Sequence, residues 1–325
     1  MKKFTNHIYY MDNNPDTDQP YVYLIHGSKF NLQIDAGNSP ENYNKFLSEV
    51  KDLGLNPPKL LAITHWHWDH TFGMVGCSVP MIASVKTNEY LKKVKNWKWT
   101  EEAMHDRLKT GEDIQFCYDC MHKQYSDIGT IQVCNADITF HSEIEIDLGD
   151  IHVKGIQIDT PHTRDAVLYY VKEEKIVIAA DAEYEDYYDN NSQYDPARLT
   201  SFIHFLEGLD FAYYLRGHDD FKLTKEEIIN NLESYKMIFV EFNNYEKFIE
   251  LFKAIEQLGY NSEWTEEEDM TSIMNLKVVK EDLKKHYESL WINIYTERKI
   301  IDLSGFYHVS KEVFDNQKVA YGTML

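Results

Sequence analysis

The chain has 325 residues, and with 43% hydrophobic and 14% aromatic residues it can bury a sizeable core, so we do not expect disorder. Its 33 basic and 54 acidic residues give a net charge of −21, which repels phosphate backbones, and no Lys/Arg-rich run is present. Composition therefore argues against a nucleic-acid partner and favours one large domain or a domain with an appendage.

Two short apolar runs open the chain, at residues 21–25 and 30–34, and they predict a β-hairpin. Residues 40–54 have helical apolar spacing, with Pro near the start and Gly at the end. A buried strand over 60–64 then brings His65 to its end. This strand–helix–strand order indicates layered α/β packing.

A helical insertion is predicted over about 84–125 from the spacing of its apolar residues. It contains Cys117 and Cys120 in a Cys-x-x-Cys arrangement, with Cys134 further on, which resembles an incomplete set of zinc ligands. A single such pair is weak evidence for a metal, so we favour buried thiols.

Short apolar runs then predict a series of strands, which favours sheet-on-sheet packing. These runs are 131–133, 138–140, 144–146, 151–153, 156–158, 167–171 and 176–178. After Thr224, which forms a capping-box pattern with Glu227, the sequence becomes mainly helical. We therefore expect a domain over 1–235 and a helical appendage over 236–325, with an approximate boundary.

Four side chains of the metal-ligand type follow the 60–64 strand within six positions: His65, His67, Asp69 and His70. Imidazole and carboxylate suit zinc, iron or manganese. Two His at i and i+2 of an extended segment point the same way and can share one ion. The alternative is chance clustering of His with packed Trp, against which the density of ligands argues.

Three later side chains extend this pattern, because each follows a strand-like run. They are His162 on a loop, Asp181 at the end of an apolar strand, and His218 after Gly217. Each one alone would more often be structural. In this order behind the first run, they predict one metal centre.

The motifs His65-x-His67-x-Asp69-His70, His162, Asp181 and Gly217-His218 resemble those of the metallo-β-lactamase superfamily, over roughly residues 20–235. The resemblance implies an α/β (α+β) fold, the αββα four-layer sandwich, here with a helical insertion and a mainly helical C-terminal appendage. By position in the family pattern, the first metal is held by His65, His67 and His162, the second by Asp69, His70 and His218, and both by a bridging Asp181.

Two divalent ions so held lower the pKa of a bridging water, giving a hydroxide nucleophile, while Asp69 can accept or deliver a proton. Asp69 and Asp181 are therefore the expected catalytic side chains. Zinc is the default ion for a His-rich set, and iron or manganese would fit the same ligands.

Two positions depart from the family pattern. The usual Gly-His-Thr-Pro-Gly loop is replaced by a sequence with Pro161 before and Arg164 after His162, which leaves its conformation and substrate contacts open. Ala180 precedes Asp181 where Gly is commoner, and we expect little consequence.

The implied ligand set favours hydrolysis of a small ester, thioester or lactone, as in glyoxalase II-like thioesterases and lactonases. True β-lactamases of the superfamily lack the bridging Asp, so Asp181 argues against β-lactam cleavage as the main activity. A phosphodiesterase or nuclease of the same fold is an alternative. So is a non-hydrolytic metal-binding protein or a diiron oxidoreductase, although the diiron enzymes carry Glu in place of His67.

Five side chains near the predicted centre are candidates for substrate contact: Trp66, Trp68, Arg164, Tyr184 and Tyr187. The Trp rings would wall the pocket, a Tyr would donate to a carbonyl, and the Arg would bind an anion. The alternatives are packed rings and an ion pair between Arg164 and Asp165.

The amino terminus shows no apolar stretch behind its first residues, and no run approaches the roughly 18 apolar residues that span a bilayer. We therefore expect a cytoplasmic protein with reduced cysteines, a small-molecule substrate and no membrane contact. A homo-oligomer is compatible with these features.

Overall fold

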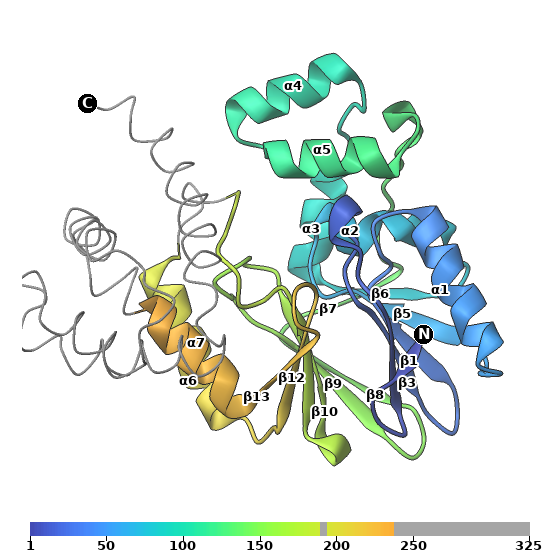
Figure 1. Cartoon of the computed structure of the whole chain (residues 1–325), viewed down its shortest axis with the longest axis vertical. Coiled ribbons are helices and arrows are strands. Elements are labelled where there is room, and N and C mark those ends of the chain that lie inside the picture. The colour runs from blue at the N-terminus through green and yellow to red at the C-terminus, as the bar shows by residue number, and fades with distance from the viewer. Residues whose placement is uncertain (189–193, 237–325) are drawn as a thin grey trace, which may run out of the picture. The chain divides into compact units, whose positions relative to one another are not determined.

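Two β-sheets lie face to face with helices on their outer sides in the computed structural model of the chain (Figure 1). The structure describes residues 1–188 and 194–236. The chain divides into the compact units Met1–Ile229 and Asn230–Leu325, and the sandwich belongs to the first. This arrangement confirms the predicted αββα class.

The first sheet holds seven strands in chain order. They are β1 Lys2–Lys3, β2 Ile8–Met11, β3 Val22–His26, β4 Asn31–Ile34, β5 Pro58–Ala62, β6 Met81–Ser84 and β7 Ile138–Phe140. Strands β3 and β4 form the predicted antiparallel hairpin. Helix α1, Pro40–Asp52, then crosses over so that β5 runs parallel to β4. The carboxyl ends of these two strands therefore meet at one edge.

The second sheet holds six strands in the order β13-β12-β11-β10-β9-β8. They are β8 Glu143–Asp147, β9 His152–Gln157, β10 Val167–Val171, β11 Ile176–Ala180, β12 Tyr213–Arg216 and β13 Lys222–Thr224. Helix α6, Pro196–Gly208, joins β11 to the parallel strand β12. All other neighbours in this sheet are antiparallel.

Three of the predicted strand runs differ from the structure. The runs 151–153 and 156–158 belong to the single strand β9, which continues through Gly155. The run 131–133 forms no strand. Its apolar residues, Ile131 and Val133, are instead buried in a cluster with the helices of the insertion. The apolar residues of this run predicted correctly that its side chains are buried. They did not predict that these side chains pack against helices instead of pairing in a sheet.

Three helices occupy the predicted insertion: α3 Val85–Val94, α4 Glu101–Thr110 and α5 Gln115–Gln124. The side chains of Ser84 and Thr100 cap the first two by accepting backbone N–H groups. Cys117 and Cys120 are buried free thiols in this part of the chain. Within the described residues, no group of candidate metal ligands includes a cysteine.

Helix α7, Lys225–Lys236, begins at the predicted capping box. The N–H of Thr224 donates to Glu227 Oε2 at 2.5 Å, and the N–H of Glu227 donates to Thr224 Oγ1 at 3.2 Å. Residues 237–325, which make up nearly all of the predicted helical appendage, lie outside the described residues. Among the helices described, none has the length and apolarity needed to cross a membrane.

Candidate metal centre

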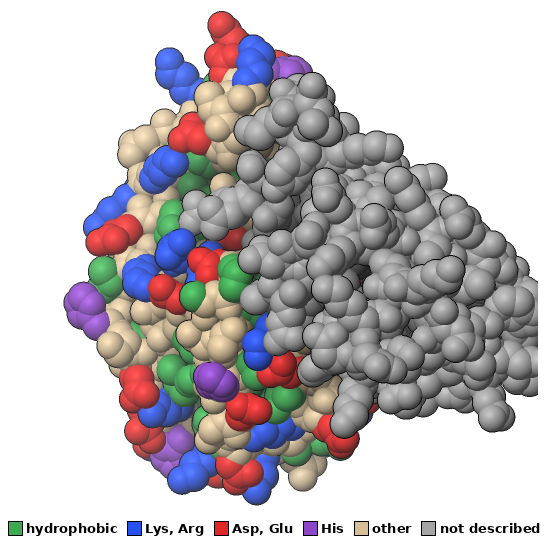
Figure 2. Space-filling view, turned by 90° about the vertical axis from the view of Figure 1, so that its left-hand side faces the viewer, with side chains coloured by type: hydrophobic (Ala, Val, Ile, Leu, Met, Phe, Trp, Pro, Cys, Tyr) green, Lys and Arg blue, Asp and Glu red, His purple; other side chains and the backbone are tan. Residues whose placement is uncertain are grey.

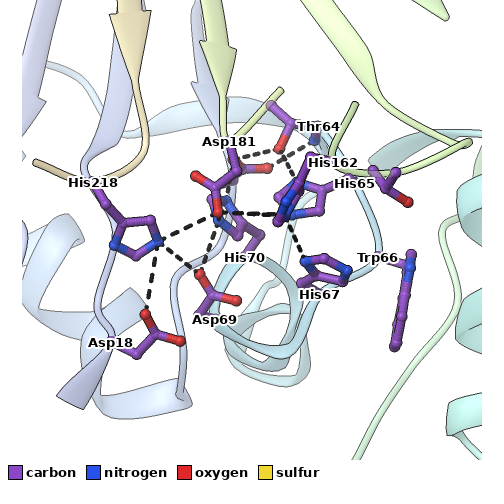
Figure 3. A network of polar contacts seen from close by, with 12 residues as sticks. Asp18, Thr64, His65, Trp66, His67, Asp69, His70, His162, Asp181 and His218 are labelled. Atoms are coloured by element: carbon purple, nitrogen blue, oxygen red, sulfur yellow. Dashed lines mark hydrogen bonds and ion pairs between the residues drawn. The ribbon is translucent and has the colours of Figure 1, made fainter. Parts of the chain in front are cut away.

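The candidate ligands gather at one edge of the sandwich, where parallel strands end (Figure 3). His65 lies three residues beyond β5, Asp181 directly follows β11, and His218 follows β12 by two residues. Asp69 and His70 lie on the short helix α2, Trp68–Thr71. Each sheet thus contributes ligands from the carboxyl ends of its parallel strands.

Three histidines, His65, His67 and His162, form the first group, with ligand atoms within 4.8 Å of one another. His162 Nε2 lies 2.9 Å from His67 Nδ1. Burial, together with the neighbouring imidazoles, holds the pKa values of His65 and His67 well below their usual range. These rings are therefore neutral at pH 7, and a neutral ring is the form of histidine that binds a metal.

A second group consists of Asp69, His70, Asp181 and His218. His70 Nε2 lies 2.9 Å from Asp69 Oδ2 and 3.1 Å from Asp181 Oδ2. His218 Nε2 lies 3.2 Å and 3.4 Å from the same two oxygens. Burial opposes a charge on either ring, but the carboxylates outweigh it and raise the pKa values of His70 and His218 well above the usual range. The second group is therefore a tight assembly of opposite charges.

Asp181 lies between the two groups. Its Oδ2 is 3.8 Å from His162 Nε2 and 4.0 Å from His65 Nε2, in addition to its contacts with the second group. Asp181 Oδ1 and His65 Nε2 are buried and lack a hydrogen-bond partner among the described residues. A buried polar atom without a partner costs about 1–3 kcal/mol. Divalent cations would satisfy these atoms, so the residues present fit a metal centre.

Gly217 makes the approach of His218 to Asp181 sterically allowed. A Cβ at this position would lie 2.0 Å from Asp181 Oδ1 and 3.2 Å from His70 Cε1. No side chain fits such a gap without displacing the carboxylate. Close packing against Asp181 therefore explains why the first residue of the Gly217-His218 pair is Gly.

Ala180 adopts the left-handed conformation, with φ of +50°. This is the position where the family pattern favours Gly, which has no Cβ to clash there. An L-residue in this region costs roughly 1–2 kcal/mol. The departure from Gly was expected to have little consequence, but the backbone conformation gives it a steric cost.

Asp35 orients His70 from behind, a role that the sequence did not reveal. Its Oδ2 lies 2.8 Å from His70 Nδ1 and accepts a hydrogen bond from Thr64 Oγ1 at 2.8 Å, while the N–H of Thr64 donates to Oδ1. A carboxylate on the outer nitrogen fixes which ring nitrogen of a ligating His faces the metal. The available signal was an acid at the end of β4, beside the strand that precedes His65.

The loop around His162 is held by contacts that replace the usual Pro-Gly sequence. His162 Nδ1 donates to the carbonyl of Glu185 at 2.9 Å. Arg198, from α6, donates through Nε to the carbonyl of Thr160 at 2.7 Å. Buried Asp165 accepts from Thr163 Oγ1 at 2.5 Å. His162 is thus anchored on both sides of the loop.

The five candidate substrate residues lie in different surroundings. Trp66 is 9% exposed, with its ring 4.7 Å from that of His67 and stacked on Tyr90 at 5.3 Å. Trp68 is 3% exposed and packs on Phe72, the arrangement expected of a core residue. Both rings therefore belong to one hydrophobic cluster, and Trp66 in addition lies beside the first group.

The two tyrosines flank the histidines. The Tyr184 ring lies 6.2 Å from His162 and 6.5 Å from His218, and its hydroxyl donates to Asp219 at 2.9 Å. Tyr187 is 37% exposed, with its ring 6.3 Å from that of His162. Both are therefore close to the candidate ligands.

The last candidate, Arg164, is an exposed residue. Its carbonyl accepts from Lys86 Nζ and from Gln157 Nε2, each at 3.1 Å. These contacts fix the backbone beside His162. A role of Arg164 in anion binding stays a prediction.

Two further residues lie near the centre, and neither was among the residues predicted from the sequence. The Tyr188 ring lies 4.8 Å from that of His67 and 5.0 Å from that of Trp66. The carboxylate of Asp18, in the loop between β2 and β3, approaches His218 with 3.9 Å between Oδ1 and Nε2. Neither belongs to a local motif.

Comparison with known proteins gives one family. The model of the metallo-beta-lactamase superfamily matches residues 15–218. No curated protein sequence matches the chain.

Three of the solved structures similar to this chain share 12–16% identity with it. The DIM-1 metallo-beta-lactamase is 15% identical, with a TM-score of 0.52, over 72% of this chain and 95% of the other. The sec-alkylsulfatase Pisa1 from Pseudomonas sp. is 12% identical, with a TM-score of 0.53, over 92% of this chain and 50% of the other. A metallo-beta-lactamase from Pontibacter korlensis is 16% identical, with a TM-score of 0.48, over 72% and 97%. At these identities the similarity shows the fold alone.

Proposed function

The chain belongs to the metallo-β-lactamase superfamily, a fold family of metal-dependent hydrolases, and from this premise we propose that it hydrolyses a small ester, thioester or lactone with two divalent ions. The observation that carries the proposal is the position of Asp181 Oδ2, within 4.0 Å of ring nitrogens from both groups. One carboxylate oxygen so placed is suited to bridge two ions. Zinc is the default for the His-rich first group.

Two bound divalent ions would supply a strongly acidified water and polarise the scissile carbonyl. Protein side chains would move the proton and hold the ligands in place. Asp69 directs Oδ2 toward His70 and His218, which leaves Oδ1 to accept a proton from the nucleophile and return it to the leaving group. Asp35 holds the His70 ring in a fixed orientation through Nδ1.

Aromatic rings beside the first group support a substrate with an apolar portion. Trp66 and Tyr188 both contact the ring of His67. Of the two predicted tyrosines, Tyr187 is the better candidate for contact with a substrate, because its side chain is exposed, although both hydroxyls already bond to an acid: Tyr184 to Asp219 and Tyr187 to Glu185.

The charge distribution gives little support to the nuclease alternative. On the face in Figure 2, Lys and Arg side chains are interspersed with Asp and Glu over the described surface and do not gather into a basic patch. A nuclease needs concentrated positive charge along its substrate. The described part of this face therefore offers no basic track for a nucleic acid, in line with the net charge of −21.

An activity screen tests the proposal. The full chain, loaded separately with zinc, manganese or iron, is assayed against esters, thioesters, lactones and phosphodiesters. We expect turnover of a carboxylic substrate, and a loss of about 100-fold or more in Asp181→Asn, because the shared oxygen then loses its charge. Asp210→Asn is the matched control, since Asp210 pairs with Lys175 at the surface. Full activity in Asp181→Asn, or turnover of phosphodiesters alone, would contradict the proposal.

A further inference from the structure

The loop between β2 and β3 is fastened beside the second group. Backbone bonds of 2.8 and 2.9 Å join Asn14 and Gln19 in both directions. The N–H of Tyr21 then donates to the carbonyl of Gly217 at 2.7 Å, directly before His218. The segment from 14 to 21 is thus held against the edge of the second sheet, although it belongs to the first.

Asp18 ends the 3-10 turn Pro15–Thr17 in the left-handed conformation, with φ of 53° and ψ of 37°. Asp tolerates this region better than most residues. The turn directs the carboxylate toward the centre, where Oδ1 lies 3.9 Å from His218 Nε2 (Figure 3). Backbone geometry therefore sets the direction of this side chain.

The Asp18 carboxylate is 13% exposed and makes no other hydrogen bond or ion pair within the described residues. Asp69 and Asp181 lie at the same nitrogen of His218, with Oδ2 atoms at 3.2 and 3.4 Å. Three carboxylates therefore face one imidazole. Buried carboxylates are ordinarily paired or coordinate a cation.

We propose that Asp18 is a third carboxylate ligand of the second group, and that this group therefore prefers an oxygen-seeking ion such as Mn²⁺ more strongly than the three-histidine group does. The inference rests on the proposed two-ion centre. It follows from donor chemistry: carboxylate oxygens suit manganese, whereas a set of imidazoles alone suits zinc. The centre would then be chemically asymmetric, with Zn²⁺ in the first group and Mn²⁺ or Fe²⁺ in the second.

A manganese titration tests the assignment. The full chain is stripped with a chelator and loaded with one equivalent of Zn²⁺. It is then titrated with Mn²⁺ alone, while the electron paramagnetic resonance signal of free Mn²⁺ is followed. We expect Asp18→Asn and Asp18→Gly to weaken Mn²⁺ binding by about 10- to 100-fold. Zn²⁺ binding to the first group, measured against a competing chelator, should stay unchanged.

The variants are chosen to keep the loop. Asn and Gly both adopt the left-handed conformation, so the turn at Asp18 is retained, and the melting temperature of the metal-free chain checks it. Asp16→Asn is the control, because Asp16 is an exposed acid in the same turn. It should leave Mn²⁺ affinity at the wild-type value.

The outcomes separate this inference from the proposed function. Folded Asp18 variants with wild-type Mn²⁺ affinity would overturn the role of Asp18 and leave the two-ion centre standing. A wild-type chain that accepts a second Zn²⁺ but no Mn²⁺ would overturn the metal preference alone. A wild-type chain that accepts no second ion of either kind would contradict both.

Discussion

Gly217 illustrates how a single missing side chain permits the candidate centre. Substitution to Ala would place a Cβ 2.0 Å from Asp181 Oδ1, so the carboxylate must move away from His70 and His218. We therefore expect Gly217→Ala to lose hydrolase activity and the metal of the second group. Metal content and turnover measure this directly.

Gly208→Ala is the matched control, because its Cβ would meet nothing within 4 Å at the end of α6. That variant should keep metal, activity and stability. Equal metal retention in the two variants would show that Gly217 does not limit the approach of these ligands.

The left-handed backbone conformation of Ala180 should lower the stability of the chain. Ala180→Gly removes the Cβ from a residue with φ of +50°, and the gain of roughly 1–2 kcal/mol exceeds the entropic cost of Gly, about 0.5–1 kcal/mol. We expect the free energy of unfolding, measured by denaturant titration of the metal-free chain, to rise by about 0.5–1 kcal/mol.

Its neighbour in β11 provides the comparison. Ala179 lies in the strand without positive φ, so Ala179→Gly should lower the free energy of unfolding by about 1 kcal/mol. If Gly is equally destabilising at both positions, the backbone strain assigned to Ala180 is absent.

The residues found from the sequence differ in kind from those that were missed. The seven candidate ligands stand in short motifs directly behind strands, and the structure brings all of them into two adjoining groups. Asp18 and Tyr188 stand in no such motif, and Asp35 directly follows β4 but was not predicted to orient a ligand. They reach the centre through contacts across the fold, such as the bond between Tyr21 and Gly217, which no local pattern encodes.

Among the secondary-structure elements, strands were predicted correctly where a turn separates one buried apolar run from the next. The hairpin of β3 and β4, helix α1 and strands β10 and β11 lie where the pattern placed them. Strand β9 was divided in two because Lys154 and Gly155 interrupt its apolar run. Close packing leaves no room for a side chain at Gly155, because a Cβ there would lie 2.9 Å from atoms of Ile144 and Tyr169.

The insertion α3–α5 contributes to the surroundings of the first group. Tyr90 of α3 stacks on Trp66 with ring centroids 5.3 Å apart, and Trp97 lies 6.5 Å from it. Arg107 of α4 in turn lies over the rings of Trp97 and Trp99, at 4.5 and 4.8 Å. A cation over two aromatic faces fixes these rings, so the aromatic wall beside His67 depends on helices distant from it in the chain.

At the scale of the sandwich, the candidate ligands come from both sheets. His65 to His70 follow a strand of the first sheet, whereas His162, Asp181 and His218 follow strands of the second. Ions bound by both sets would link the two layers, and binding to the folded state alone raises stability. Substrate choice depends on loop side chains, which the ligand motifs do not specify.

Elemental analysis of the full chain, purified without chelators, shows whether the protein holds two divalent ions. We expect close to two divalent ions per chain in the wild type, and the loss of at least one in Asp181→Asn with the fold intact by circular dichroism. A wild-type chain that hydrolyses its substrate with one ion or none, or an Asp181→Asn chain that retains two, would contradict a centre built around a shared carboxylate.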